Sequence, residues 1–140
     1  MKTVRFIAFI ILISQCMPVF ASGSDSPDLS DSELSGIVSA VLNHPDVSIY
    51  LHPEVPGRVP LVVAIGKPYS YRNIDVSMFG EEIVVTTDPA DLKKAVKLRI
   101  SCDTGKCLVK IGYDPEGIFG EIELTPTDDE WSVTKAVIYE

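Results

Sequence analysis

The sequence predicts an α+β domain in which one N-terminal amphipathic helix packs on an antiparallel sheet of about five or six strands. Three observations predict this fold class. A capped amphipathic segment occupies residues 31–43, a series of short β-patterned segments follows from residue 83, and the spacing of two cysteines agrees with the alternation around them. The chain has 140 residues, of which 46% are hydrophobic. This composition is enough for one core but not comfortably for two.

Residues 1–21 have the pattern of a cleavable secretory signal peptide. Lys2 and Arg5 form a basic start, residues 6–13 are all apolar, and a small-x-small cleavage site precedes Ser22. The apolar run is much shorter than the roughly 20 residues that cross a bilayer. We therefore expect export to the periplasm or the outside of the cell, with no membrane insertion after cleavage. Acylation of Cys16, as in a lipoprotein, stays open as an alternative, although the bulky Gln15 precedes it.

The remaining chain is strongly acidic. The whole sequence has a net charge of −8, and residues 1–21 contain two basic and no acidic residues, so residues 22–140 carry −10. We expect a flexible acidic lead-in at 22–29 and a single domain at 30–140. Such a charge repels nucleic acid and anionic lipid and attracts basic partners. Plain solubility is the alternative explanation.

The helix is the first element expected. Ser30 and Glu33 form a capping box, and Leu29 and Leu34 occupy the positions of a hydrophobic staple. Asn43 and the proline at 45 end the segment. One apolar stripe contains Leu34, Ile37, Val38, Val41 and Leu42.

The strands follow from shorter apolar runs. Asp88 and Pro89 have the pattern of a short helical turn that leads into the next strand. Proline and glycine divide residues 44–60, where a short strand is expected between the breaks. The expected strands are 47–51, 61–65, 83–87, 96–102, 107–113, 119–125 and 131–139.

Cys102 and Cys107 are expected to form a disulfide that closes a hairpin. An exported chain reaches an oxidising compartment, and the spacing differs from a C-x-x-C redox motif or a zinc knuckle. With a four-residue turn at 103–106, the inward faces of 96–102 and 107–113 coincide and place the cysteines opposite each other. The resulting helix-on-meander layout resembles that of secreted cystatin-like domains. The likeness concerns layout and implies no function.

The hairpin is also where positive charge gathers. Residues 93–110 carry a local charge of +5. In the register above, Lys97, Arg99 and Lys110 share the outward face, and Arg99 lies opposite Lys110, a destabilising like-charge pair. Relief by Glu121 and Glu123 on the next strand is the favoured interpretation, and a strip that binds an anionic group or partner is the alternative.

Two loops carry a second set of candidate partner-binding residues. Arg58 lies in a Pro- and Gly-rich segment, and Tyr69, Tyr71 and Arg72 follow the next predicted strand. Aromatic and arginine side chains are enriched at interface hot spots. Covering the edge of the core is the alternative role for them.

The two histidines are weak candidates for metal ligands. His44 and His52 each precede a proline and stand two residues before a carboxylate. Nothing in the spacing forces the two segments together, so we interpret these His-Pro pairs as loop boundaries and expect no metal and no cofactor.

Catalytic motifs are absent from the sequence, since it contains no Gly-x-Ser-x-Gly, phosphate-binding Gly-rich loop or His-Glu-x-x-His. We therefore expect a small exported binding protein without catalytic activity, an inhibitor or immunity-type antagonist of another protein. A carrier or sensor of a small ligand is the alternative. An apolar cavity under Leu34, Ile37 and Val41 would favour the carrier, whereas a packed core with exposed Arg58, Tyr69 and Tyr71 would favour the protein binder.

Overall fold

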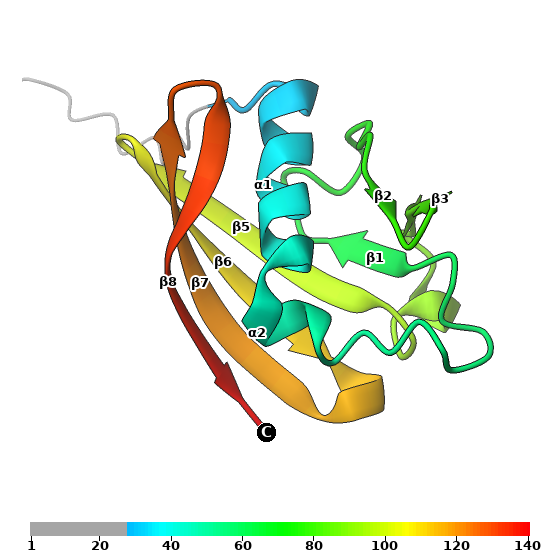
Figure 1. Cartoon of the computed structure of the whole chain (residues 1–140). Helices are drawn as coiled ribbons and strands as arrows, with labels where there is room; N and C mark the ends of the chain where they lie inside the picture. The colour runs from blue at the N-terminus through cyan, green and yellow to red at the C-terminus, as the bar shows by residue number, and fades with distance from the viewer. Residues whose placement is uncertain (1–27) are drawn as a thin grey trace, which may run out of the picture.

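A computed structural model describes residues 28–140, so the predicted signal peptide, Cys16 and most of the lead-in lie outside the described residues. The fold is α+β, with one main helix on a mixed sheet of six strands (Figure 1). The helical elements are α1 (Asp31–Asn43), α2 (Pro45–Ser48) and two 3-10 turns, η1 (Pro89–Asp91) and η2 (Asp114–Glu116). The strands are β1 (Val62–Ile65), β2 (Ser77–Met78), β3 (Glu81–Glu82), β4 (Val84–Val85), β5 (Val96–Asp103), β6 (Lys106–Tyr113), β7 (Ile118–Thr127) and β8 (Glu130–Tyr139).

Helix α1 covers the range that its sequence predicts. The Ser30 side chain accepts a hydrogen bond from the Glu33 backbone N–H at 3.1 Å, and the Glu33 carboxylate accepts one from the Ser30 N–H at 2.8 Å. These bonds favour the ionised carboxylate and lower the pKa of Glu33. Leu29, which the sequence assigns to the flexible lead-in, is instead buried in the core together with Leu34.

The strand predicted at 47–51 is wrong, because this segment forms α2 and the turns after it. His44 caps α2, since its Nδ1 accepts a hydrogen bond from the Asp46 N–H, and proline occupies the first helical turn. Val47 and Leu51 are buried while Ile49 is 61% exposed, which is the i, i+4 pattern of a helical turn and not strand alternation.

The main sheet is mixed, so the antiparallel sheet predicted from the sequence is only partly correct. Its strand order is β4-β1-β5-β6-β7-β8. Strands β5 to β8 form the expected antiparallel meander, but β1 pairs in parallel with both β4 and β5. A parallel pair needs a long crossover between its strands, and residues 66–95 provide one between β1 and β5.

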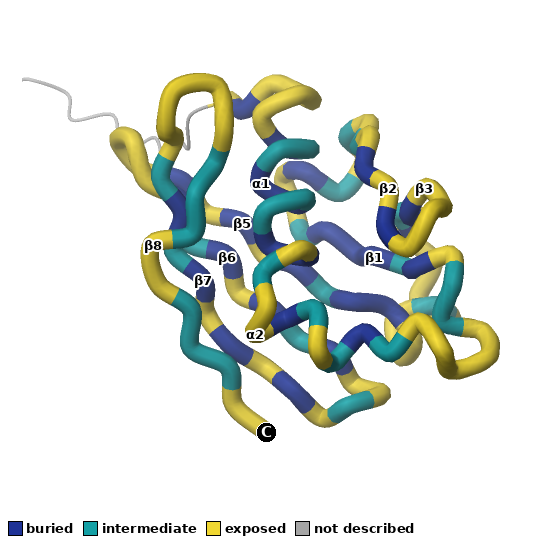
Figure 2. The backbone as a smooth tube through the Cα atoms, in the orientation of Figure 1, coloured by how far each residue is buried: buried dark blue, intermediate teal, exposed yellow. Residues whose placement is uncertain are grey.

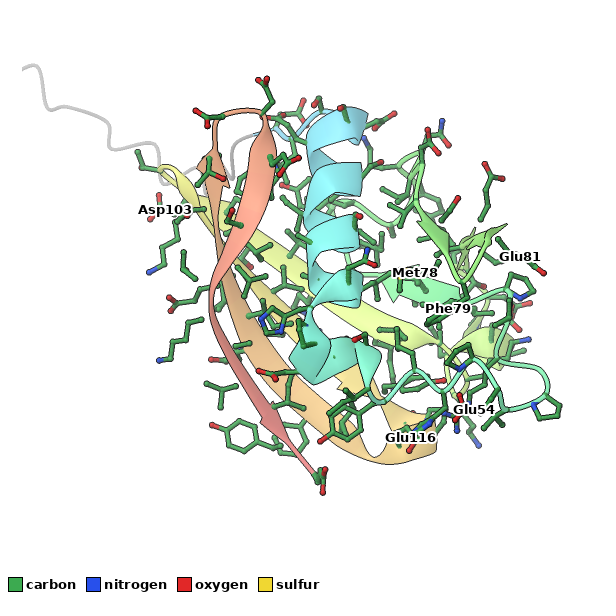
Figure 3. The ribbon with its side chains drawn as sticks, viewed as in Figure 1. Glu54, Met78, Phe79, Glu81, Asp103 and Glu116 are labelled. Atoms are coloured by element: carbon green, nitrogen blue, oxygen red, sulfur yellow. A yellow bond between two sulfur atoms is a disulfide. The ribbon has the colours of Figure 1, made fainter. Side chains whose placement is uncertain are left out.

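The crossover carries a small hairpin made of β2 and β3. Its turn residues, Phe79 and Gly80, both have positive φ angles, and Figure 3 shows Met78, Phe79 and Glu81 at this hairpin. The strand predicted at 83–87 is shortened to β4, because Asp88 caps η1 and Pro89 begins it.

The β5–β6 hairpin has the predicted register, with Cys102 opposite Cys107 and Arg99 opposite Lys110. The two cysteines are joined by a disulfide and lie in the core. The turn is shorter than expected, because Asp103 and Lys106 also pair and leave only two residues between the strands. Gly105 supplies the positive φ angle that such a turn needs.

We expect native protein, alkylated without prior reduction, to incorporate no label at Cys102 or Cys107. Reduction followed by alkylation should label both and lower the free energy of unfolding by about 2 kcal/mol, because the closed loop is short. Mass spectrometry and urea denaturation measure these effects. Rapid labelling of both thiols in unreduced protein would contradict the disulfide-linked hairpin.

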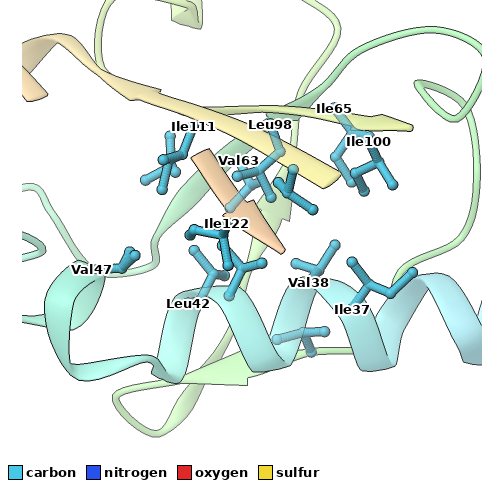
Figure 4. Packing of buried hydrophobic residues seen from close by; sticks show 14 of the residues in the cluster. Ile37, Val38, Leu42, Val47, Val63, Ile65, Leu98, Ile100, Ile111 and Ile122 are labelled. Atoms are coloured by element: carbon cyan, nitrogen blue, oxygen red, sulfur yellow. The ribbon is translucent and has the colours of Figure 1, made fainter. Parts of the chain in front are cut away.

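One hydrophobic core joins α1 to the sheet. Ile37, Val38 and Leu42 pack towards residues of β1, β5, β6 and β7 (Figure 4). Figure 2 shows buried and exposed residues alternating along the central strands. The buried residues of these strands belong to the same core as the buried residues of α1. Within residues 28–140, no helix is both long and apolar enough to cross a membrane.

Candidate functional site

The sheet face turned away from α1 is the best candidate for a binding surface. Along β5, β6 and β7, every second residue is exposed or only partly buried. We define the open face by the residues that point away from the helix on these strands and on β8. It contains Lys97, Arg99, Leu108, Lys110, Gly112, Phe119, Glu121, Glu123, Lys135, Val137 and Tyr139.

The basic strip predicted from the sequence lies on this open face. Lys97 forms an ion pair with Asp114 at 2.8 Å. Lys110 lies 3.6 Å from Glu121, and Lys106 lies 3.5 Å from Glu123. Glu121 and Glu123 therefore neutralise nearby cations as predicted, but the cations that they pair with are lysines and not Arg99.

Arg99 is the exception among these cations. Its register partner on β6 is Lys110, and on its other side it lies beside Gly66, the residue that follows β1. Among the described residues, the Arg99 guanidinium has no carboxylate within ion-pair distance. Within the described residues, Arg99 therefore has a like charge as its cross-strand neighbour and no acidic partner.

A shallow depression of about 440 Å³ lies beside Arg99 on the open face. Ala64 and Gly112 form its floor, and Leu92 borders it from the segment after η1. The surrounding cations are Lys97, Arg99 and Lys110. The depression therefore combines an apolar floor with a positively charged margin.

An exposed aromatic pair lies on the same face. Phe119 and Tyr139 stack with ring centroids 5.2 Å apart, and they are 58% and 52% exposed. The register places Lys97, Gly112, Phe119 and Tyr139 in one row across four strands. Gly112, which lines the depression and has no side chain, pairs with Phe119, so within this row no side chain separates the depression from the aromatic pair.

Replacing Arg99 by glutamate should stabilise the protein. Glutamate at this position would face Lys110, which is already bordered by Glu121, so repulsion should become attraction. We expect the free energy of unfolding to rise by about 0.2–1 kcal/mol in urea melts. Arg99→Gln, which only removes the charge, should lie between wild type and Arg99→Glu. A loss of stability in Arg99→Glu would show that Arg99 is relieved internally.

Arg58 is committed to internal contacts. Its guanidinium forms an ion pair with Glu116 and lies 5.6 Å from the centroid of the Tyr113 ring. Burial raises the pKa of Tyr113, and the nearby Arg58 charge partly opposes this effect. Glu54 and Glu116 lie at the same end of the molecule (Figure 3), where both contact His52.

The loop with Tyr69, Tyr71 and Arg72 divides between core and surface. Tyr69 is 3% exposed and belongs to the core, whereas Tyr71 is 82% exposed. Arg72 binds the start of α1, donating to Asp31 at 2.6 Å, to Asp28 at 3.2 Å and to the Leu29 carbonyl at 2.6 Å. Of this loop's three candidates, only Tyr71 remains fully available to a partner.

The two histidines have separate local roles. His44 caps α2, and the Nδ1 atom of His52 lies 2.8 Å from Glu54. Over residues 28–140, no group of three or more histidine, cysteine or acidic side chains is arranged to hold a metal ion.

The sequence reasoning missed the aromatic pair and Gly112. Alternation along 119–125 points Phe119 outward, so half of the signal was present in the sequence. The pairing of Phe119 with Tyr139 depends on a register shift between Glu123 and Leu124, which alternation alone does not reveal.

Comparison of the chain with known proteins identifies no family to which it belongs. No protein-family model matches the chain, and neither a curated protein nor a solved structure matches it.

Proposed function

We propose that this protein is a small exported binding protein without catalytic activity, and that its partner is another protein. The role would be that of an inhibitor or an immunity-type antagonist. The observation that supports this most is the open face, where the stacked and half-exposed Phe119–Tyr139 pair lies on the same side of the sheet as Arg99, which has no acidic partner within residues 28–140. Aromatic and arginine side chains are the types that dominate binding energy in protein interfaces.

The carrier or sensor of a small ligand remains the second candidate. A carrier would need an apolar cavity between helix and sheet, yet Leu34, Ile37 and Val41 are fully buried and belong to the packed core. The depression beside Arg99 lies on the opposite face of the sheet and is open. The packed core favours protein binding, although Arg58 and Tyr69 are not the exposed anchors that the sequence suggested.

Export is tested by the mass of the protein recovered from its producing cells. We expect a chain that starts at Ser22 and contains one disulfide. A chain that starts at a lipid-modified Cys16 would show that the protein is exported as a membrane-anchored lipoprotein. An intact chain that keeps Met1 would contradict export.

Protein binding through the open face is tested by photo-crosslinking in the producing cells. A photoreactive phenylalanine analogue placed at Phe119 should give one discrete protein adduct. The same analogue at Ile49, which is 61% exposed on α2, is the matched control and should give none. The adduct should be identified, and its affinity for the purified protein measured by calorimetry. Equal crosslinking from both positions, or none from Phe119, would contradict the proposal.

A further inference from the structure

We infer that the depression beside Arg99 binds a carboxylate of the partner, an aspartate or glutamate side chain flanked by apolar residues. This inference rests on the proposed function and specifies the chemistry of its contact. The local charge at the site is opposite to that of the chain, whose net charge is −8.

The charges around Arg99 favour an anionic ligand. Lys97 and Lys110 each have an acidic neighbour, at 2.8 Å and 3.6 Å, but Arg99 lies opposite Lys110 without one in the described part of the chain. Like charges directly opposite each other destabilise a sheet. A carboxylate bound at Arg99 would offset the repulsion between Arg99 and Lys110. This relief would make the free energy of binding more favourable.

The guanidinium of Arg99 favours a carboxylate among the possible anions. A guanidinium presents a planar fork of N–H donors that matches a carboxylate in a bidentate geometry. Arg99 is exposed, and none of its guanidinium donors has a carboxylate partner within residues 28–140. Its whole fork is therefore available to a carboxylate from outside.

The apolar lining of the depression favours an acidic residue with apolar neighbours. Ala64 is 8% exposed and Leu92 is 37% exposed, and Gly112 leaves the floor low between β5 and β7. A free anion would leave this apolar surface wet, whereas an acidic residue with apolar neighbours would cover it. Beyond Gly112, the Phe119–Tyr139 pair offers a second apolar contact to the same segment.

The inference is tested by selecting random peptides displayed on phage against the folded protein, with Arg99→Gln as the counter-selected target. We expect enriched peptides to contain an acidic residue beside apolar ones. For the best peptide, Arg99→Gln should weaken binding about tenfold or more, and replacing the acidic residue by its amide should do the same.

Two further variants separate charge from shape. Lys135→Gln removes an exposed cation on the open face outside the depression, and it should change the affinity less than about twofold. Gly112→Val places a side chain in the depression without changing charge, and it should weaken peptide binding about tenfold. The fold should tolerate this side chain, since a Cβ at Gly112 meets no atom within 4 Å.

Enrichment of basic peptides, equal binding to wild type and Arg99→Gln, or no enrichment would each overturn the inference. Equal affinity for free 3-phenylpropionate and for the peptide would also overturn it, in favour of a small-acid site. Crosslinking from Phe119 is independent of these outcomes. A discrete adduct from Phe119 together with peptides that show no preference for acidic residues would support protein binding and reject only the carboxylate contact.

Discussion

Replacing Gly120 by alanine should destabilise the protein strongly. A Cβ at this position would lie 2.3 Å from the Val137 carbonyl oxygen and 2.7 Å from the Ile138 Cδ1 atom. The carbonyl belongs to the backbone of β8 and cannot move without breaking strand pairing. We expect the free energy of unfolding to fall by about 3 kcal/mol, at the upper end for overpacking, and the melting temperature by about 10 °C.

Gly112→Ala is the matched control for this experiment. Gly112 lies in the neighbouring strand, but a Cβ there meets no atom within 4 Å. Alanine should be neutral or slightly stabilising, because it reduces the entropy of the unfolded chain. Similar melting temperatures for the two variants would show that β7 and β8 do not approach each other as described.

Gly120 also lies next to the aromatic pair of the open face. It follows Phe119 in β7 and pairs with Ile138, which precedes Tyr139 in β8. The close approach of the two backbones at Gly120 lies next to the pair of rings that stack at 5.2 Å. We therefore expect Gly120→Ala to disturb the aromatic pair together with the fold.

Val41→Asp should remove cooperative unfolding or prevent accumulation of folded protein. Val41 is fully buried in the core at the contact of α1 with the sheet. An unpaired carboxylate there costs several kcal/mol, of the order of the whole stability of a small domain. Thermal melts followed by circular dichroism measure the effect.

The control is Ser32→Asp, which places the same charge on an exposed position in the first turn of the same helix. A negative charge is favourable at a helix N-terminus, so the melting temperature should change by only a few degrees. A Val41→Asp variant that melts like Ser32→Asp would mean that α1 is not part of the core.

The local elements were predictable because their signals lie within a few residues. The capping box at Ser30 and Glu33 and the apolar stripe define α1, since both depend on contacts three or four positions apart. The register of β5 and β6 follows from strand alternation and the cysteine spacing, because a one-residue slip would turn every side chain to the other face. The basic strip on the outward face followed from the same register.

The other features of the fold and of the candidate site depend on which distant segments lie side by side. The alternation of apolar and polar residues along a strand does not contain this information. The parallel pairing of β1 with β5 depends on the path of a crossover about 30 residues long, whose loops lack a periodic pattern. The stack of Phe119 on Tyr139 depends on a bulge, and the isolation of Arg99 depends on Glu121 lying beside Lys110 and not beside Arg99. By itself the sequence determined the helix, the hairpin and the side on which the cations lie. Only the tertiary structure showed that Arg99, within the basic strip of the described residues, has no acidic partner, because ion pairing depends on the distance between side chains on different strands.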